Sequence, residues 1–174
     1  YELIFFDFDG VIKDSNNIKT EAFRKLFDKY GKSISSKVVE HHKQNTGISR
    51  FEKIPYYYEN FLNTKLDSGQ IKKVNKEFSN IVMNDVINSK WIKYSYEFLL
   101  NNSFNQEFIL ITGTPQDEIN YICRSLKINN CFKEIYGSPI QKDKVVEKYL
   151  SDKPNLKKHS IYIGDSFVDY TAAI

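Results

Sequence analysis

Three short apolar runs limit most strongly what this chain can fold into. In each, Ile, Leu, Phe or Tyr occupy both alternating faces and a polar or glycine-containing cluster follows; the runs cover residues 2–8, 107–112 and 160–164. Strands that are apolar on both faces are typical of a parallel sheet covered by helices on each side. A weaker run covers residues 134–136, and segments 115–126 and 142–150 are expected to be helices. This alternation predicts a doubly wound, parallel α/β sheet.

Residues 16–88 interrupt the alternation, because no convincing buried strand occurs there. The apolar spacing predicts helices over residues 17–30, 36–44, 49–62 and 68–88. Pro55 should either begin the third helix or kink it, since proline lacks the N–H that a helix interior uses. At least two of the three consecutive tyrosines, 56–58, are expected in the core of this segment. We therefore predict an all-helical segment, residues 16–88, inserted into an α/β core of residues 1–15 and 89–174.

The composition excludes several classes of function. A net charge of +3, from 25 basic and 22 acidic residues among 174, is too small and too dispersed to predict nucleic-acid binding. The chain has no apolar run of about 18 residues that could cross a membrane, and its first residues do not resemble a signal peptide. Cys123 and Cys131 match no common metal-binding spacing. We expect a cytoplasmic monomer or weak dimer that binds neither membranes nor nucleic acids.

Two aspartates stand at the C-terminal end of the first apolar run, in the segment Phe6–Val11. Asp7 and Asp9 stand two residues apart before Gly10. In a strand extended to its end they would point to one face, at the sheet edge where parallel α/β sheets bind ligands. Two carboxylates there favour a hard cation such as Mg²⁺. An Asx turn that closes the strand is the alternative interpretation.

A second acidic pair follows the run at 160–164. Asp165 ends that strand, and Asp169 lies one helical turn later. If this strand neighbours the first, Asp7 and Asp165 could share one ion. The alternative for Asp169 is stabilisation of a helix N-terminus, where a negative charge complements the helix dipole.

The strand at 107–112 is followed by hydroxyl groups and a glycine. Thr112, Gly113 and Thr114 stand just before Pro115, which is expected in the first turn of a helix. Exposed N–H groups and a short side-chain donor at a helix N-terminus form an anion site. An ordinary N-cap is the alternative.

A lysine at the start of the helix over 142–150 is unfavourable for the helix dipole unless it has an anionic partner. Lys142 is therefore the candidate for bridging the carboxylates and a phosphate. Lys144 is the second choice, and a solvated lysine is the alternative interpretation.

In their order and spacing, these four motifs resemble those of the haloacid dehalogenase superfamily of phosphotransferases, over nearly the whole chain. The inserted helical segment is similar to the small helical cap of the branch that holds phosphoglycolate phosphatase and β-phosphoglucomutase. The resemblance implies that Asp7 attacks phosphorus and forms an aspartyl-phosphate, and that Asp9 is the general acid and base. It implies that Mg²⁺ is held by Asp7, the Asp9 carbonyl oxygen and Asp165, supported by Asp169.

The resemblance also assigns residues to the substrate. Thr112, Gly113 and Lys142 would stabilise the phosphoryl oxygens, with Thr114 beside them. Gly47–Arg50 resembles the Gly-x-Ser-Arg sequence of the cap's substrate loop, so Arg50 is a candidate for binding the distal end of the substrate; a surface arginine at a helix start is the alternative.

Two positions bear on the choice of activity within the family. Asp9 favours a phosphate monoester over the dehalogenating and phosphonate-cleaving branches. Lys19, also counted as substrate-binding, stands where β-phosphoglucomutase-like members have a histidine. We therefore predict an Mg²⁺-dependent phosphatase acting on a small phosphorylated metabolite, with a β-phosphoglucomutase-like phosphotransferase and a non-catalytic phospho-ligand-binding homologue as alternatives.

Overall fold

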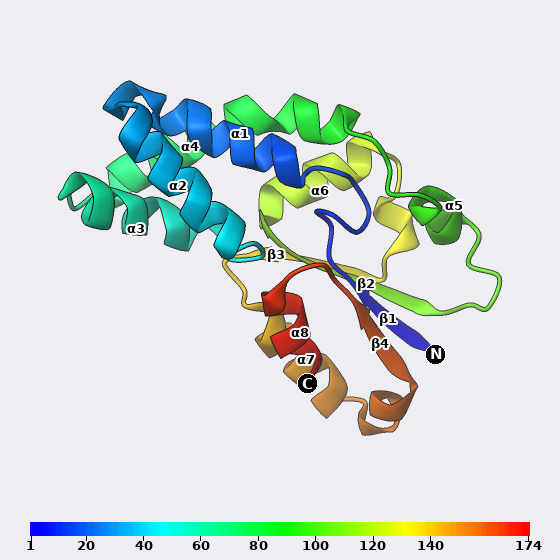
Figure 1. The fold of residues 1–174 in the computed structure, drawn as a ribbon. Helices are drawn as coiled ribbons and strands as arrows, with labels where there is room; N and C mark the ends of the chain where they lie inside the picture. Colours follow the sequence, from blue (N-terminus) through cyan, green and yellow to red (C-terminus); the bar gives the residue numbers. More distant parts are fainter.

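The computed structural model describes residues 1–174 and centres on a four-stranded sheet. All neighbouring strands are parallel and their order is β3-β2-β1-β4 (Figure 1). The strands are β1 (Leu3–Phe6), β2 (Glu107–Pro115), β3 (Glu134–Ser138) and β4 (Ser160–Ile163). The predicted parallel sheet is thus confirmed, including the weak run at β3. Strand β1 lies between β2 and β4, so the segments that follow these three strands meet at one sheet edge.

Helices cover both faces of the sheet, as expected for a doubly wound fold. Alternate residues of β1 and β2 enter two different hydrophobic clusters. One cluster contains buried residues of α5 and α6, and the other contains buried residues of α7 and α8. The bounds are α5 (Ser95–Leu100), α6 (Gln116–Ser125), α7 (Lys142–Ser151) and α8 (Phe167–Ala173), with 3₁₀ turns η2 (Asn129–Cys131) and η3 (Pro154–His159). Helix α5 was not predicted, because six residues are too few for a clear periodicity.

The start of α6 differs from the prediction. Pro115 has φ −54° and ψ 144°, an extended conformation, and is the last residue of β2. Helix α6 therefore begins at Gln116, and the segment Thr112–Thr114 belongs to the strand rather than to the first helical turn.

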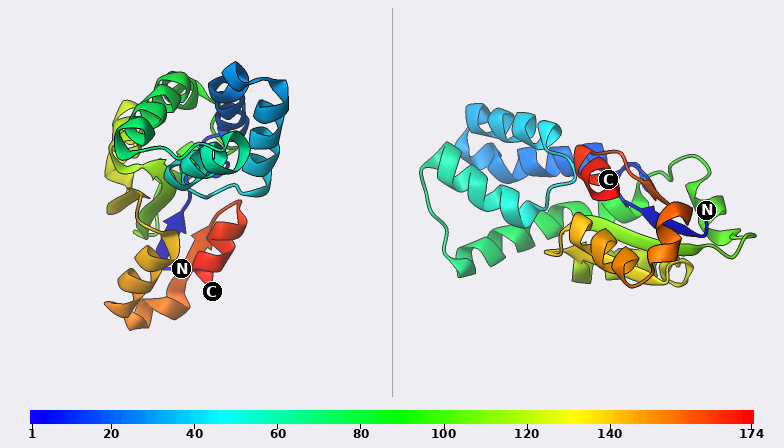
Figure 2. Two further views of the ribbon diagram at one scale, coloured as in Figure 1. Left: turned by 90° about the vertical axis from the view of Figure 1, so that its left-hand side faces the viewer. Right: turned by 90° about the horizontal axis from the view of Figure 1, so that it is seen from below.

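Four of the five helices between β1 and β2, α1 to α4, form a layer beside the carboxyl end of the sheet (Figures 1 and 2). Helix α2 starts earlier than predicted, directly after Gly31, and Pro55 lies inside α3 rather than at its start. The side chain of Ser49 caps α3 by accepting the N–H of Phe51. The bounds are α1 (Asn16–Phe27), η1 (Asp28–Tyr30), α2 (Lys32–Gln44), α3 (Arg50–Leu62) and α4 (Ser68–Asn88).

The hydrophobic core of these helices is continuous with one face of the sheet. A single cluster of buried residues contains Phe23 and Tyr57 of the helical layer together with Phe6 and Phe108 of the sheet. Tyr57 and Tyr58 are buried whereas Tyr56 is 40% exposed, which confirms that two of the three tyrosines are core residues. Because one cluster joins both parts, the division at residues 16–88 stays a prediction about domains.

A polar cluster lies at the opposite, N-terminal end of β2. Glu107 accepts hydrogen bonds from Lys133 (2.6 Å), Tyr149 (2.7 Å) and Lys153 (3.1 Å). Partial burial opposes ionisation, but these hydrogen bonds prevail and lower the pKa of Glu107 to about 2. No helix in the structure is both long and apolar enough to cross a lipid bilayer.

Candidate active site

Three carboxylates converge where β1 and β4 end. Asp7 follows β1, while Asp165 and Asp169 follow β4, and each offers an oxygen within 4.8 Å of the others. Asp7 and Asp169 are buried and Asp165 is exposed. Asn16 donates a 2.7 Å hydrogen bond to Oδ2 of Asp165. The predicted meeting of Asp7 with the second acidic pair is thus observed, because β1 and β4 are paired in register.

A buried lysine joins two of these carboxylates. Nζ of Lys142 lies 3.0 Å from Oδ1 of Asp7 and 2.6 Å from Oδ1 of Asp169. The alternative of a solvated Lys142 is wrong, since the residue is only 4% exposed. Lys144, the second choice, is not part of the site: it is exposed and pairs with Glu147 on its own helix.

The charges of this cluster do not balance. Three carboxylates face one ammonium group. Burial is the main cause that raises the pKa of Asp7 to about 7; Lys142 opposes the rise, and Asp169 and Asp9 add to it. Carboxylate oxygens are the ligands that a hard cation such as Mg²⁺ prefers. The residues present therefore fit a divalent cation held by Asp7, Asp165 and Asp169.

Asp169 also has a structural role. Its Oδ2 accepts the N–H of Ser166 at 3.0 Å, and the side chain of Ser166 in turn caps the N-terminus of α8. This capping box is the alternative foreseen for Asp169. It fixes one carboxylate oxygen at the helix start while the other faces Lys142.

Asp9 points to a different set of partners from Asp7. Its carboxylate accepts Oγ of Ser15 at 2.6 Å and forms an ion pair with Lys19. The strand does not extend to Asp9, because β1 ends at Phe6 and the chain turns at Gly10, where φ is 75°; the two carboxylates therefore have different partners although both line one cavity. Burial opposes ionisation of Asp9, but the Lys19 ammonium prevails and lowers the pKa of Asp9. A ligand role for Asp9 would therefore fall to its carbonyl oxygen.

Gly10 is required at this turn for a second reason. A Cβ added to it would lie 2.0 Å from Oδ2 of Asp165, in addition to the strain of its positive φ. The backbone after Asp9 thus runs directly against the third carboxylate of the cluster.

The end of β2 forms another wall of the site. Thr112 and Gly113 line a cavity together with Lys142, and Oγ1 of Thr112 accepts the N–H of Thr114 at 3.2 Å. Oγ1 of Thr114 accepts a hydrogen bond from Nζ of Lys19 at 2.8 Å. Helix α6 starts only at Gln116, so these groups end a strand directly before a helix. The N-cap alternative is wrong, because Pro115 precedes the helix without any side-chain cap.

The loop before α3 reaches this wall. A Cβ added to Gly113 would lie 2.9 Å from the carbonyl oxygen of Gly47, so only glycine fits here without a shift. Gly47 and Ile48 line both the cavity at Lys142 and a second cavity above Asp9. The helical layer therefore closes directly over the end of the sheet.

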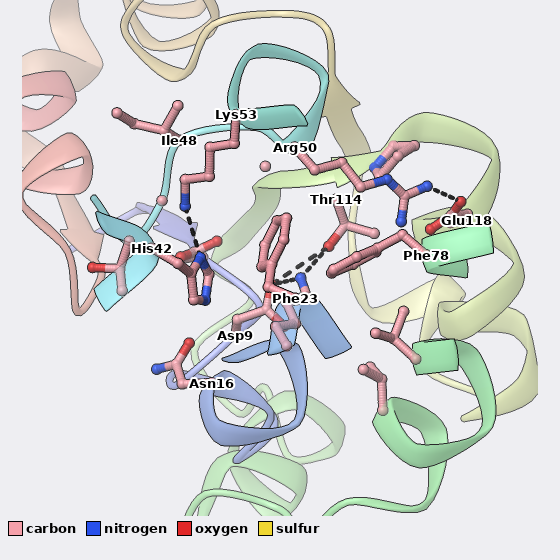
Figure 3. Close-up of a pocket in the computed structure, with 18 of the residues that line it drawn as sticks. Asp9, Asn16, Phe23, His42, Ile48, Arg50, Lys53, Phe78, Thr114 and Glu118 are labelled. Carbon is pink, nitrogen blue, oxygen red and sulfur yellow. Dashed lines mark hydrogen bonds and ion pairs between the residues drawn. The ribbon is translucent and has the colours of Figure 1, made fainter. Parts of the chain in front are cut away.

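The cavity above Asp9 has a volume of about 60 Å³ and lies between the sheet edge and helices α1 to α4 (Figure 3). Arg50 lines it and already has three polar partners: Nε donates to Asn75 (3.1 Å), and one terminal nitrogen contacts Ser79 (2.8 Å) and Glu118. The alternative of a surface arginine is wrong, because Arg50 is 8% exposed.

Sequence reasoning missed several residues of this cavity. His42, Lys53 and Glu118 face it, as does Asn16 beside Asp165 (Figure 3). Lys53 stands three residues after Arg50 and therefore on the same helix face. That spacing was the only signal that could have indicated Lys53; the other three lie on helices without a motif around them.

The model of the haloacid dehalogenase-like hydrolase family matches residues 4–174. The chain therefore belongs to the haloacid dehalogenase-like hydrolases. It is 24% identical over 145 residues to a phosphorylated carbohydrates phosphatase from Thermotoga maritima, an alignment that covers 82% of this chain and 64% of that protein. The chain thus spans less than two-thirds of this relative.

Solved structures share the fold at low sequence identity. A hydrolase from Pseudomonas syringae superposes with a TM-score of 0.76 at 14% identity, covering 99% of this chain and 80% of that one. A β-phosphoglucomutase from Clostridium difficile superposes with a TM-score of 0.74 at 23% identity, covering 99% of this chain and 82% of that one. A haloacid dehalogenase-like family hydrolase from Streptococcus pneumoniae gives 0.69 at 22% identity, with 99% and 79% coverage.

Proposed function

We propose that this chain is an Mg²⁺-dependent phosphatase that hydrolyses a small phosphate monoester through an aspartyl-phosphate intermediate. The observation that carries the proposal is the convergence of Asp7, Lys142, Asp165 and Asp169 at one sheet edge. Family membership supports phosphoryl transfer, and the name of the Thermotoga maritima relative supports a small phosphorylated substrate.

Asp7 is the proposed nucleophile. Its Oδ1 is engaged by the N–H of Phe8 at 2.7 Å and by Lys142 at 3.0 Å. Oδ2 has no hydrogen bond from the chain and is the oxygen that would attack phosphorus. The bond to phosphorus forms as the bond to the leaving alcohol breaks, and water later releases phosphate from Asp7.

The phosphoryl oxygens need positive charge and donors around them. Thr112, the N–H of Gly113 and Lys142 line one cavity and would supply these donors. A divalent cation held by Asp7, Asp165 and Asp169 would neutralise part of the phosphate charge and so admit the anionic substrate to an acidic cluster.

Asp9 is the proposed general acid and base. It would protonate the leaving oxygen and then accept a proton from the attacking water, a contribution that is typically about 10²–10⁴-fold. Lys19 and Ser15 hold its carboxylate at the floor of the cavity above Asp9. The lowered pKa of Asp9 favours the ionised form, which suits the half-reaction that accepts a proton.

The test is phosphate release from p-nitrophenyl phosphate and a panel of metabolite phosphates, with Mg²⁺ and with EDTA. Release should require Mg²⁺ and fall by at least about 10³-fold in Asp7→Asn. The matched control is Asp85→Asn, which changes an exposed aspartate of α4 and should keep full activity. Release that survives in Asp7→Asn would overturn the proposal, and phosphate exchange between sugar phosphates without net release would favour the phosphotransferase.

A further inference from the structure

Lys53 is a buried lysine in the cavity above Asp9. It projects from α3, is 3% exposed, and places Nζ 3.0 Å from Nδ1 of His42 on α2 (Figure 3). His42 is itself 7% exposed and packs against Phe23 with the rings tilted and their centroids 4.7 Å apart. Both side chains line the same cavity as Asp9 and Thr114.

Lys53 differs from the other cations of the cavity in having no carboxylate partner. Lys19 is paired with Asp9, and Arg50 is paired with Glu118. The single hydrogen bond of Lys53 is to the ring of His42. Burial is the main cause that lowers the pKa of Lys53 to about 7 and that of His42 to about 3, so the imidazole is a neutral partner.

Burying a lysine without a counter-charge is costly, and lysine is almost never fully buried unless it is paired. Packing does not require an ammonium group at this position, because a Met side chain would fill similar space. An ammonium group has three donors, and His42 can accept only one of them. The remaining donors of Lys53 are therefore available to a ligand that enters the cavity.

The position of the cavity says which part of a ligand would reach Lys53. Asp7 and Asp9 lie at its floor, so a phosphate bound at Asp7 directs its ester oxygen and alcohol into this space. Arg50 already forms an ion pair with Glu118 and donates hydrogen bonds to Ser79 and Asn75, so its positive charge is balanced within the chain. Lys53 is the one lysine or arginine side chain lining the cavity that forms no ion pair.

We propose that Lys53, oriented by His42, binds a second anionic group carried by the alcohol portion of the substrate. The substrate class is then a small phosphate monoester with a carboxylate or a second phosphate on its leaving group, since both offer the same acceptor chemistry to an ammonium. The cavity volume of about 60 Å³ favours a short leaving group. This inference rests on the proposed phosphatase function.

The first experiment compares matched substrates that differ in the second anion. kcat/KM is measured for 2-phosphoglycolate against ethyl phosphate, and for glucose 1,6-bisphosphate against glucose 6-phosphate. In at least one pair the wild type should prefer the member with the second anion by about 10-fold or more in kcat/KM. Lys53→Met should reduce that preference by about 10- to 100-fold, as expected for losing a charge-assisted hydrogen bond. The pair that responds identifies a carboxylate or a phosphate as the second anion.

Lys43→Met is the matched control, because Lys43 stands next to His42 but is exposed. The substrate preference of this variant should equal that of the wild type. Lys53→Gln repeats the test if the Met variant does not fold. The inference is overturned if the wild type prefers the members that lack the second anion, or if the Lys53 variants keep the wild-type preference.

A binding measurement separates this inference from the proposed function. Calorimetric titration of 2-phosphoglycolate and ethyl phosphate into Asp7→Asn, with and without Lys53→Met, requires no turnover. Lys53→Met should raise the Kd of 2-phosphoglycolate by about 10-fold or more relative to the Kd of ethyl phosphate. Absence of phosphate release with this binding difference intact would sink the phosphatase proposal alone, whereas equal Kd values in the two backgrounds would sink the anion site.

Discussion

The acidic cluster predicts an unusual response to Asp165→Asn. Two carboxylate charges 4.8 Å apart, the upper limit for this cluster, repel by about 3.5 kcal/mol at an effective dielectric constant of about 20. The net repulsion is smaller, because Asp165 is exposed and Lys142 attracts it. We therefore expect the free energy of unfolding of the variant to rise by about 1–2 kcal/mol in metal-free buffer. For a protein of this size that gain raises Tm by about 2–8 °C.

With Mg²⁺ present, the wild type should have a higher Tm than Asp165→Asn. At about 100 times its Kd, an ion that binds only the folded state stabilises it by about 2.7 kcal/mol, which is about 5–11 °C in Tm. The wild type should show this rise and Asp165→Asn should show much less. The assay is thermal unfolding followed by circular dichroism, in EDTA and in a series of Mg²⁺ concentrations.

Asp85→Asn again serves as the control, because it removes an exposed carboxylate away from the cluster and should shift with Mg²⁺ as the wild type does. A metal-free Asp165→Asn protein that unfolds below the wild type, together with equal Mg²⁺ shifts in both, would refute the argument that the three carboxylates share one cation.

Three further perturbations test the packing and the other ion pairs. Glu107→Gln should cost about 0.5–1 kcal/mol at pH 7, and in urea titrations the cost should vanish as the pH falls from 4.5 to about 2, because ionisation of Glu107 stabilises the fold only above its lowered pKa; a cost independent of pH would contradict this. Tyr57→Ala should lower the free energy of unfolding by about 3–5 kcal/mol and Tyr56→Ala by less than about 1, since only Tyr57 is fully buried; equal losses would count against this core. Glu118→Gln should cost about 3 kcal/mol in the same assay, because it leaves Arg50 buried without its counter-charge, and a neutral effect would show that the pair does not hold α3 to α6.

The sequence predicted well which acidic side chains meet at the sheet edge. Asp7 and Thr112 lie at the end of an apolar run and Asp165 directly follows one, and the carboxyl ends of neighbouring parallel strands meet at one edge. Their meeting therefore needed only the strands and their order. Lys142 was indicated by a local conflict, a lysine at a helix N-terminus, which its two carboxylate partners resolve.

Errors arose where the local backbone could take more than one course. Helix α6 begins at Gln116 and not at Pro115, and β1 ends at Phe6, before the turn that sets the partners of Asp9. One or two residues at the end of an element decide which partners a side chain meets. Apolar periodicity does not fix such boundaries.

The sequence by itself determined which segments form buried strands and amphipathic helices, and hence the α/β class and the sheet edge where the motifs gather. Only the tertiary structure decided how charges are shared in the cavity above. Arg50 finds Glu118, which lies 68 residues away in the chain, and Lys53 is left beside the neutral ring of His42. Periodicity records which face of a helix is buried, whereas the partner of a buried charge depends on how helices distant in sequence pack against each other.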